Sequence, residues 1–140
     1  MAIAPRRILI TGATGFVGRH LTAALPAAFP DASLFIPEFD ISDPTAVDSA
    51  ISQSLPDVCL HLAAISTNAQ AMPDETHTWA VNLHGPLHLA RAILQHTRDC
   101  QLLFVSTADA YGASYRSGNK LDESAALAPL SLYSATKAAA

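Results

Sequence analysis

Tyr133 and Lys137 lie four residues apart in the stretch YSATK of this 140-residue chain. On a helix this spacing places two side chains on one face, one turn apart. An ammonium group beside a phenol stabilises the phenolate and lowers the pKa of the tyrosine toward the working pH. Such a tyrosine can exchange a proton with an oxygen that changes between carbonyl and alcohol. The pair is therefore a candidate acid–base group, although the same spacing also occurs on solvated helices.

The stretch TGATGFVG, residues 11–18, follows the apolar run ILI and carries glycines at three-residue intervals. Gly12 would permit a tight turn, Gly15 would let a pyrophosphate approach the backbone, and Gly18 would let a helix pack closely on a sheet. Free N–H groups in the first turn of that helix would face the phosphates. A plain tight turn also needs glycine, but the position between a strand and a helix favours dinucleotide binding.

These candidate groups depend on the elements that position them. Apolar patterns predict strands over residues 8–11, 33–39, 57–64 and 101–107, and helices over residues 16–25, 43–55, 75–96 and 129–140. We expect Pro26 to end the first helix, Pro37 to mark a strand end or an edge strand, and Gly85 with Pro86 to kink the long helix. Residues 108–124 are polar and predict a loop. The alternation predicts an α/β fold, a Rossmann-type doubly wound parallel sheet with ligands at the carboxyl ends of its strands.

Composition narrows the classes of partner. Half of the residues are hydrophobic, 14% are charged and the net charge is −4, so we expect a globular chain without the basic face that binds nucleic acid or anionic membranes. No stretch approaches the roughly 20 apolar residues of a membrane span, and no signal peptide is evident, so we expect a cytoplasmic protein. Cys59 and Cys100 are expected as free thiols. His77, His84 and His88 lack companion ligands, so no metal is expected.

Six ordered blocks extend these motifs over nearly the whole chain. They are TGATGFVG at 11–18, DISD at 40–43, HLAA at 61–64, VNLHGPLHLARAI at 81–93, VSTADAYG at 105–112 and YSATK at 133–137. In this order they resemble the extended short-chain dehydrogenase/reductase family, the NAD-dependent epimerases and dehydratases that act on nucleotide sugars together with related reductases.

The resemblance implies a catalytic group and a cofactor site. Thr107, five residues before Gly112, would hydrogen-bond the reacting oxygen while Tyr133 moves the proton beside Lys137. A hydride would pass between the nicotinamide and a sugar carbon. Asp109 is a further catalytic candidate, and its alternative is a solvated loop acid. The residues implied for the cofactor are Gly12, Thr14, Gly15, Phe16, Val17, Gly18, Asp40, Ile41, Leu62, Ala63, Ala64, Asn82, Val105, Tyr133 and Lys137.

The two positions after Thr107 bear on the reaction. Many dehydratases of the family carry an acidic pair there, whereas this chain has Ala108 and Asp109, so the elimination of that kind is poorly supported. The resemblance is strongest to bacterial reductases of GDP-linked 4-keto-6-deoxy sugars. Dehydratases and 4-epimerases of the family remain alternatives. A non-catalytic NAD(P)-binding module, or an inactive fragment, is the alternative of another class.

Cofactor choice and domain organisation complete these expectations. No lysine or arginine lies between Arg19 and Arg91, and Glu38 would repel a 2′-phosphate, so NAD is favoured, although Arg19 could reach the 2′-phosphate of NADP. Because members of the family are longer, residues 1–140 are expected to form an incomplete cofactor domain. The last strands and the C-terminal substrate domain would be absent, and catalysis by these residues alone would be weak or nil. The resemblance also implies a homodimer through the helices around 76–96 and from 131 onward.

Overall fold

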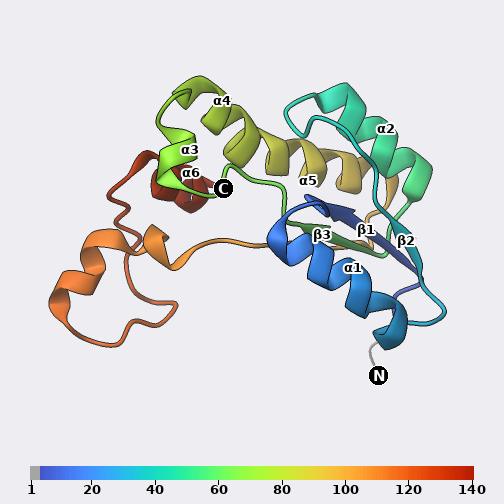
Figure 1. The fold of residues 1–140 in the computed structure, drawn as a ribbon, viewed down its shortest axis with the longest axis horizontal. Coiled ribbons are helices and arrows are strands. Elements are labelled where there is room, and N and C mark those ends of the chain that lie inside the picture. Colours follow the sequence, from blue (N-terminus) through green and yellow to red (C-terminus); the bar gives the residue numbers. More distant parts are fainter. Residues whose placement is uncertain (1–3) are drawn as a thin grey trace.

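A computed structural model describes residues 4–140 and contains one parallel sheet with helices on both faces (Figure 1). The strands are β1 (Arg7–Thr11), β2 (Ser33–Phe35), β3 (Val58–His61) and β4 (Gln101–Phe104). They pair in the order β2-β1-β3-β4 with every neighbouring pair parallel. The chain leaves β1 in one direction for β2 and then crosses back over β1 to β3. This reversal is the switch point beside which doubly wound sheets bind their ligands.

The alternating side chains of β1 fill two cores. Ile8 and Ile10 pack with Leu25 of α1 (Phe16–Ala28) on one face. Leu9 packs on the other face with Cys59 of β3 and with the apolar sides of α2 (Pro44–Ser54) and α5 (Gly85–His96). Both faces of the central strands are thus covered, which explains why these strands are continuous apolar runs. The predicted α/β class and doubly wound parallel sheet are confirmed.

The remaining helices gather beyond the carboxyl ends of the strands (Figure 1). They are α3 (Asn68–Ala71), α4 (Glu75–Trp79) and α6 (Leu132–Ala139), and α6 contacts both of the others. Ser131 caps α6 through reciprocal hydrogen bonds with Ser134, and this local signal fixes where the helix begins. The sheet and these helices therefore bring residues 132–139 next to the strand ends.

Several predicted boundaries were wrong. Pro26 does not end α1, which runs to Ala28, because Pro26 is exposed and the carbonyl that its ring leaves without a partner can turn toward solvent. The second, third and fourth strands are shorter than predicted, and β2 ends before Pro37, as an edge strand should. The predicted loop at 108–124 contains two 3-10 turns, Ala108–Ala110 and Gly112–Ser117.

The predicted kink near Gly85 is a π-helical turn, Ala80–His84, that joins α4 to α5. Pro86 has no N–H to donate to the preceding turn, so the regular hydrogen-bond ladder cannot continue through it. Gly85 also packs closely on the loop after β2, because a Cβ at Gly85 would lie 2.9 Å from a side-chain carbon of Ile41. No helix within residues 4–140 has the length and apolar character needed to cross a membrane.

Candidate functional site

The glycine loop joins the carboxyl end of β1 to α1. Gly12 has a φ of +71°, and a Cβ there would lie 2.5 Å from the backbone nitrogen of Ala63, directly after β3. The same nitrogen donates a hydrogen bond to Thr11 Oγ1 at 3.3 Å. A Cβ at Gly18 would overlap the backbone of Gly12 and Ala13. These two glycines are therefore required by the packing of the loop on itself and on the end of β3.

Gly15 is less crowded than the other two glycines. A Cβ there would meet only the carbonyl oxygen of Gly12, at 3.2 Å. Gly15 is also the N-cap of α1 and supplies no side-chain cap, whereas α2 and α6 are capped by Asp43 and Ser131. The N–H groups of the first turn of α1 are thus free of side-chain acceptors, and Thr14, Phe16 and Val17 beside them are exposed. An open backbone with free donors at a helix N-terminus suits an anionic ligand.

Asp40 and Ile41, two of the residues that the family resemblance implies for the cofactor, lie in different environments. Asp40 is exposed, and its Oδ1 accepts hydrogen bonds from the backbone nitrogen and the hydroxyl of Ser42 at 2.9 and 2.7 Å. These bonds lower the pKa of the Asp40 carboxyl, which keeps it ionised. Ile41 is buried in the core against Gly85, so its side chain is committed to packing.

The short segment after β3 and the end of β4 carry the other implied cofactor residues. Leu62, Ala63 and Ala64 are half-buried there, with Leu62 packed on the α1 side of the sheet, and Val105 is 47% exposed. They lie at the same edge of the sheet as the glycine loop, because Ala63 contacts Gly12 directly.

Asn82 lies in the π-helical turn and is buried among polar partners. Its Oδ1 accepts from the backbone nitrogen of Ile65 at 2.9 Å, and its Nδ2 donates to the Ile65 carbonyl at 3.0 Å. Nδ2 also donates to Thr136 Oγ1 at 3.0 Å, and Thr136 in turn donates to the carbonyl of Tyr133 at 2.7 Å. One side chain thus ties the segment after β3 to α6. Asn82 is thus placed to support the candidate site by holding α6 next to the end of β3.

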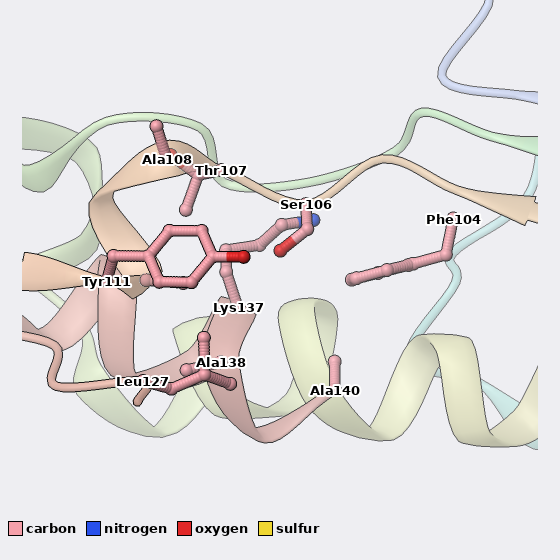
Figure 2. Close-up of a pocket in the computed structure, with 10 residues that line it drawn as sticks. Phe104, Ser106, Thr107, Ala108, Tyr111, Leu127, Lys137, Ala138 and Ala140 are labelled. Atoms are coloured by element: carbon pink, nitrogen blue, oxygen red, sulfur yellow. The ribbon is translucent and has the colours of Figure 1, made fainter. Parts of the chain in front are cut away.

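A cavity of about 510 Å³ lies at the carboxyl end of β4. Figure 2 shows the hydroxyl groups of Ser106 and Tyr111 pointing toward one another, and Thr107 and Lys137 line the same cavity. Thr107 Oγ1 accepts from the backbone nitrogen of Asp109 at 3.2 Å, so its own hydrogen remains available for donation. The cavity therefore combines a cation with several hydroxyl groups.

Lys137 is the charged group of this cavity and is only 5% exposed. Within residues 4–140 no carboxylate forms an ion pair with it. Its Nζ lies 4.0 Å from the centroid of the Phe104 ring. Burial lowers the pKa of Lys137 to about 8, because the charged form loses hydration. A buried ammonium without an ion-pair partner can bind an anionic or hydroxyl-bearing ligand through its N–H groups.

Two predicted catalytic residues lie apart from the cavity lining. Asp109 is exposed, and Tyr133 is half-buried one turn before Lys137 on α6, but neither lines the cavity. The structure instead adds Phe104, Ser106 and Tyr111, which the sequence reasoning did not assign to the site. Ser106 could have been predicted as a site residue, since it directly precedes Thr107 and both follow the end of β4. The contribution of Phe104 had no sequence signal, because it depends on how α6 meets β4.

Comparison with known proteins places the chain in a family. The sequence model of the NAD dependent epimerase/dehydratase family matches residues 8–140. The GDP-6-deoxy-D-mannose reductase of Pseudomonas aeruginosa is 33% identical over 137 residues, covering 96% of this chain and 45% of the relative. The dTDP-4-dehydrorhamnose reductase of Mycobacterium tuberculosis is 36% identical over 145 residues, covering 99% of this chain and 45% of the relative.

Solved structures agree with the sequence comparison. The structure of RMD from Pseudomonas aeruginosa complexed with NADPH superposes with a TM-score of 0.80 at 30% identity, covering 96% of this chain and 46% of that one. The chain thus spans about half the length of the proteins that it matches. The family model covers nearly all of the 140 residues, and the fold agrees with it. The chain belongs to the NAD dependent epimerase/dehydratase family.

Proposed function

We propose that these residues form the cofactor-binding half of a nucleotide-sugar oxidoreductase that uses NAD(P) and reduces a 4-keto group of a GDP-linked 6-deoxyhexose. The observation that carries this proposal is Lys137, a buried cation that no carboxylate of residues 4–140 pairs with, in a cavity with hydroxyl groups at the carboxyl end of β4. A cation with nearby hydroxyl donors at the ligand edge of a doubly wound sheet suits a ribose and a reacting oxygen.

The chain has the features that a dinucleotide needs. The exposed backbone at Gly15 and the free N–H groups of α1 would hold the pyrophosphate, and exposed Asp40 would lie at the adenosine end. Lys137 would donate hydrogen bonds to ribose hydroxyls. When bound, the nicotinamide supplies the hydride. Thr107 would hold the reacting oxygen through its free hydroxyl hydrogen.

The choice of reduction and of a GDP-linked sugar rests on two further observations. Ala108 stands where a second acid would be needed for elimination, so reduction is the better supported reaction. A GDP-6-deoxy-D-mannose reductase is 33% identical to this chain and a dTDP-4-dehydrorhamnose reductase is 36% identical, so a dTDP-linked sugar is the alternative substrate. A 4,6-dehydratase remains the second candidate because Asp109, directly after Ala108, could serve as its remaining acid.

We also propose a cytoplasmic homodimer that forms through α4, α5 and α6. Leu87 and Leu94 are 44% and 63% exposed on α5, and seven residues separate them, so both lie on one face of the helix. The opposite face of α5 is already buried against the sheet and α2. The exposed leucines would therefore be available to a second copy.

The assignment of Tyr133 as proton donor is tested by a pair of tyrosine variants. In the full-length product of the gene, Tyr133→Phe is expected to lower kcat for reduction of a GDP-linked 4-keto-6-deoxyhexose by about 10²- to 10⁴-fold. Tyr111→Phe is the matched control, since it removes a second phenol from the same end of the sheet, and about a tenfold loss or less is expected. Stopped-flow absorbance of NAD(P)H measures both. If Tyr111→Phe showed the large loss and Tyr133→Phe did not, Tyr111 would be the proton donor.

Cofactor preference is a separate prediction for the 140-residue chain itself. We expect NADH to bind about tenfold more tightly than NADPH, a difference of about 1.4 kcal/mol, because lysine and arginine are missing between Arg19 and Arg91. Isothermal titration calorimetry measures both dissociation constants. The similar structure with NADPH makes the opposite preference a real alternative. Tighter NADPH binding that is lost in Arg19→Ala would contradict the prediction and assign the 2′-phosphate to Arg19.

A further inference from the structure

The ring of Phe104 lies next to two nitrogen-bearing side chains, His61 of β3 and Lys137 of α6. Phe104 ends β4 and pairs in register with His61, which ends β3. The two rings are stacked with centroids 5.9 Å apart and an interplanar angle of 28°. Lys137 Nζ lies 4.0 Å from the centroid of the same Phe104 ring. We propose that Phe104 is a positioning residue whose π-face holds the Lys137 ammonium in place of a carboxylate.

The surroundings of Lys137 support this role. A cation that is 5% exposed needs an electrostatic partner, and none of the carboxylates in residues 4–140 forms an ion pair with it. An aromatic face attracts a cation through its quadrupole without neutralising the charge. The contact with Phe104 therefore holds the ammonium at the cavity while its N–H groups remain free for a ligand. Figure 2 shows the Lys137 side chain among the residues that line this cavity.

His61 keeps the arrangement free of a second cation. It is 2% exposed, and its Nδ1 is hydrogen-bonded to Thr11 Oγ1 at 2.7 Å. Burial and the neighbouring Lys137 charge lower the pKa of His61 to about 4, so the imidazole is neutral near pH 7. The Phe104 ring thus contacts one neutral ring and one cation.

A continuous series of contacts follows from this geometry. Ala63, against which Gly12 packs, is hydrogen-bonded to Thr11, and Thr11 is hydrogen-bonded to His61. His61 and Phe104 complete the series to Lys137. The glycine loop and the lysine, which are expected to hold the pyrophosphate and a ribose of one cofactor, are therefore positioned by the ends of the same three strands. The use made of Lys137 rests on the proposed function, whereas its contact with Phe104 does not.

The chain offers a direct measurement, because Lys120 and Lys137 are its two lysines. With [ε-¹³C]lysine the protein gives two titrating NMR signals, which Lys120→Arg assigns. Mono-, di- and trifluorophenylalanine at position 104 weaken the ring quadrupole in steps while nearly keeping its shape. The pKa of Lys137 is expected to fall stepwise by about 0.5 to 1 unit in total, and the Lys120 signal serves as the internal reference. Phe104→Leu should lower it similarly. An unchanged Lys137 pKa throughout the series would overturn the proposal.

Phe35 provides the matched control. The Phe35 ring lies in β2, which is the outer strand of the sheet on the side opposite β4. It is 5.1 Å from the guanidinium carbon of Arg7 and therefore makes a second cation–π contact. The same fluorinated series at Phe35 is expected to leave the Lys137 pKa unchanged. An equal fall in that series would show a general effect of fluorination and would also overturn the proposal. These titrations need no cofactor or substrate, so they distinguish failure of this contact from failure of the proposed reaction.

Discussion

Gly12→Ala is expected to destabilise the chain by about 2 to 5 kcal/mol, from overpacking of about 1 to 3 kcal/mol and a left-handed backbone that costs a non-glycine residue about 1 to 2 kcal/mol. The new methyl carbon would lie 2.5 Å from the nitrogen of Ala63, and backbone on both sides leaves little room to relax. Since single domains have total stabilities of about 5 to 15 kcal/mol, this is a large fraction. Urea denaturation followed by circular dichroism measures the change.

Gly118 separates the two causes of this loss. Its φ of +70° nearly equals that of Gly12, but a Cβ there would have nothing within 4 Å. Gly118→Ala should therefore cost only the backbone term, about 1 to 2 kcal/mol. If the two variants lost equal stability, crowding between the glycine loop and the end of β3 would have no energetic weight. That result would remove the steric reason for glycine at position 12.

Asn82→Ala is expected to destabilise the chain by about 3 kcal/mol or more. Each buried polar group that loses its hydrogen-bonding partner costs about 1 to 3 kcal/mol of stability. Both backbone groups of Ile65 and the hydroxyl of Thr136 would lose their Asn82 contacts. We expect α6 to separate first, since its attachment to the π-helical turn runs through this side chain. Hydrogen exchange of the α6 amides, together with urea denaturation, measures this local loss.

Asn68→Ala is the control for the asparagine variant. Asn68 is exposed at the start of α3, so this variant should change stability by about 0.5 kcal/mol or less. Trp79, the single tryptophan, lies directly before the π-helical turn and reports on its unfolding. If Asn82→Ala unfolded at the same urea concentration as Asn68→Ala, the hydrogen bonds of Asn82 would not hold α6.

Elements with a long and regular apolar pattern could be predicted from the sequence. Short elements, and features that depend on a single tertiary contact, could not. The apolar strands and the helix spacing of Val47 and Ile51 were sufficient to predict the sheet and α2, because burial on a sheet imposes those periods. The four-residue α3 and the 3-10 turns were missed, since such short elements have no period to detect. The interruption near Gly85 and Pro86 was predicted as a kink, but the close packing of Gly85 on Ile41 was not, because it is a tertiary contact.

The candidate site was predictable only in part for the same reason. Motif spacing identified the glycine loop, Thr107 and Lys137, which the structure gathers at one edge of the sheet. The cavity itself combines β4, a 3-10 turn and α6, and their contacts connect residues more than twenty positions apart. Tyr111 and Phe104 enter the site through these contacts alone. The role of Tyr133 stays a prediction that the variant pair tests.

The central place of β1 has a consequence for how the chain folds. β1 is synthesised first, yet its partner β3 arrives fifty residues later, as the pair Thr11 and His61 shows. Pairing over such separations closes long loops and therefore slows folding. On the ribosome, β2 can pair with one edge of β1 first, but the edge of β1 that faces β3 must stay unpaired until residue 61 has emerged. The nascent chain is consequently most vulnerable to misassociation during this interval, before the ligand edge of the sheet exists.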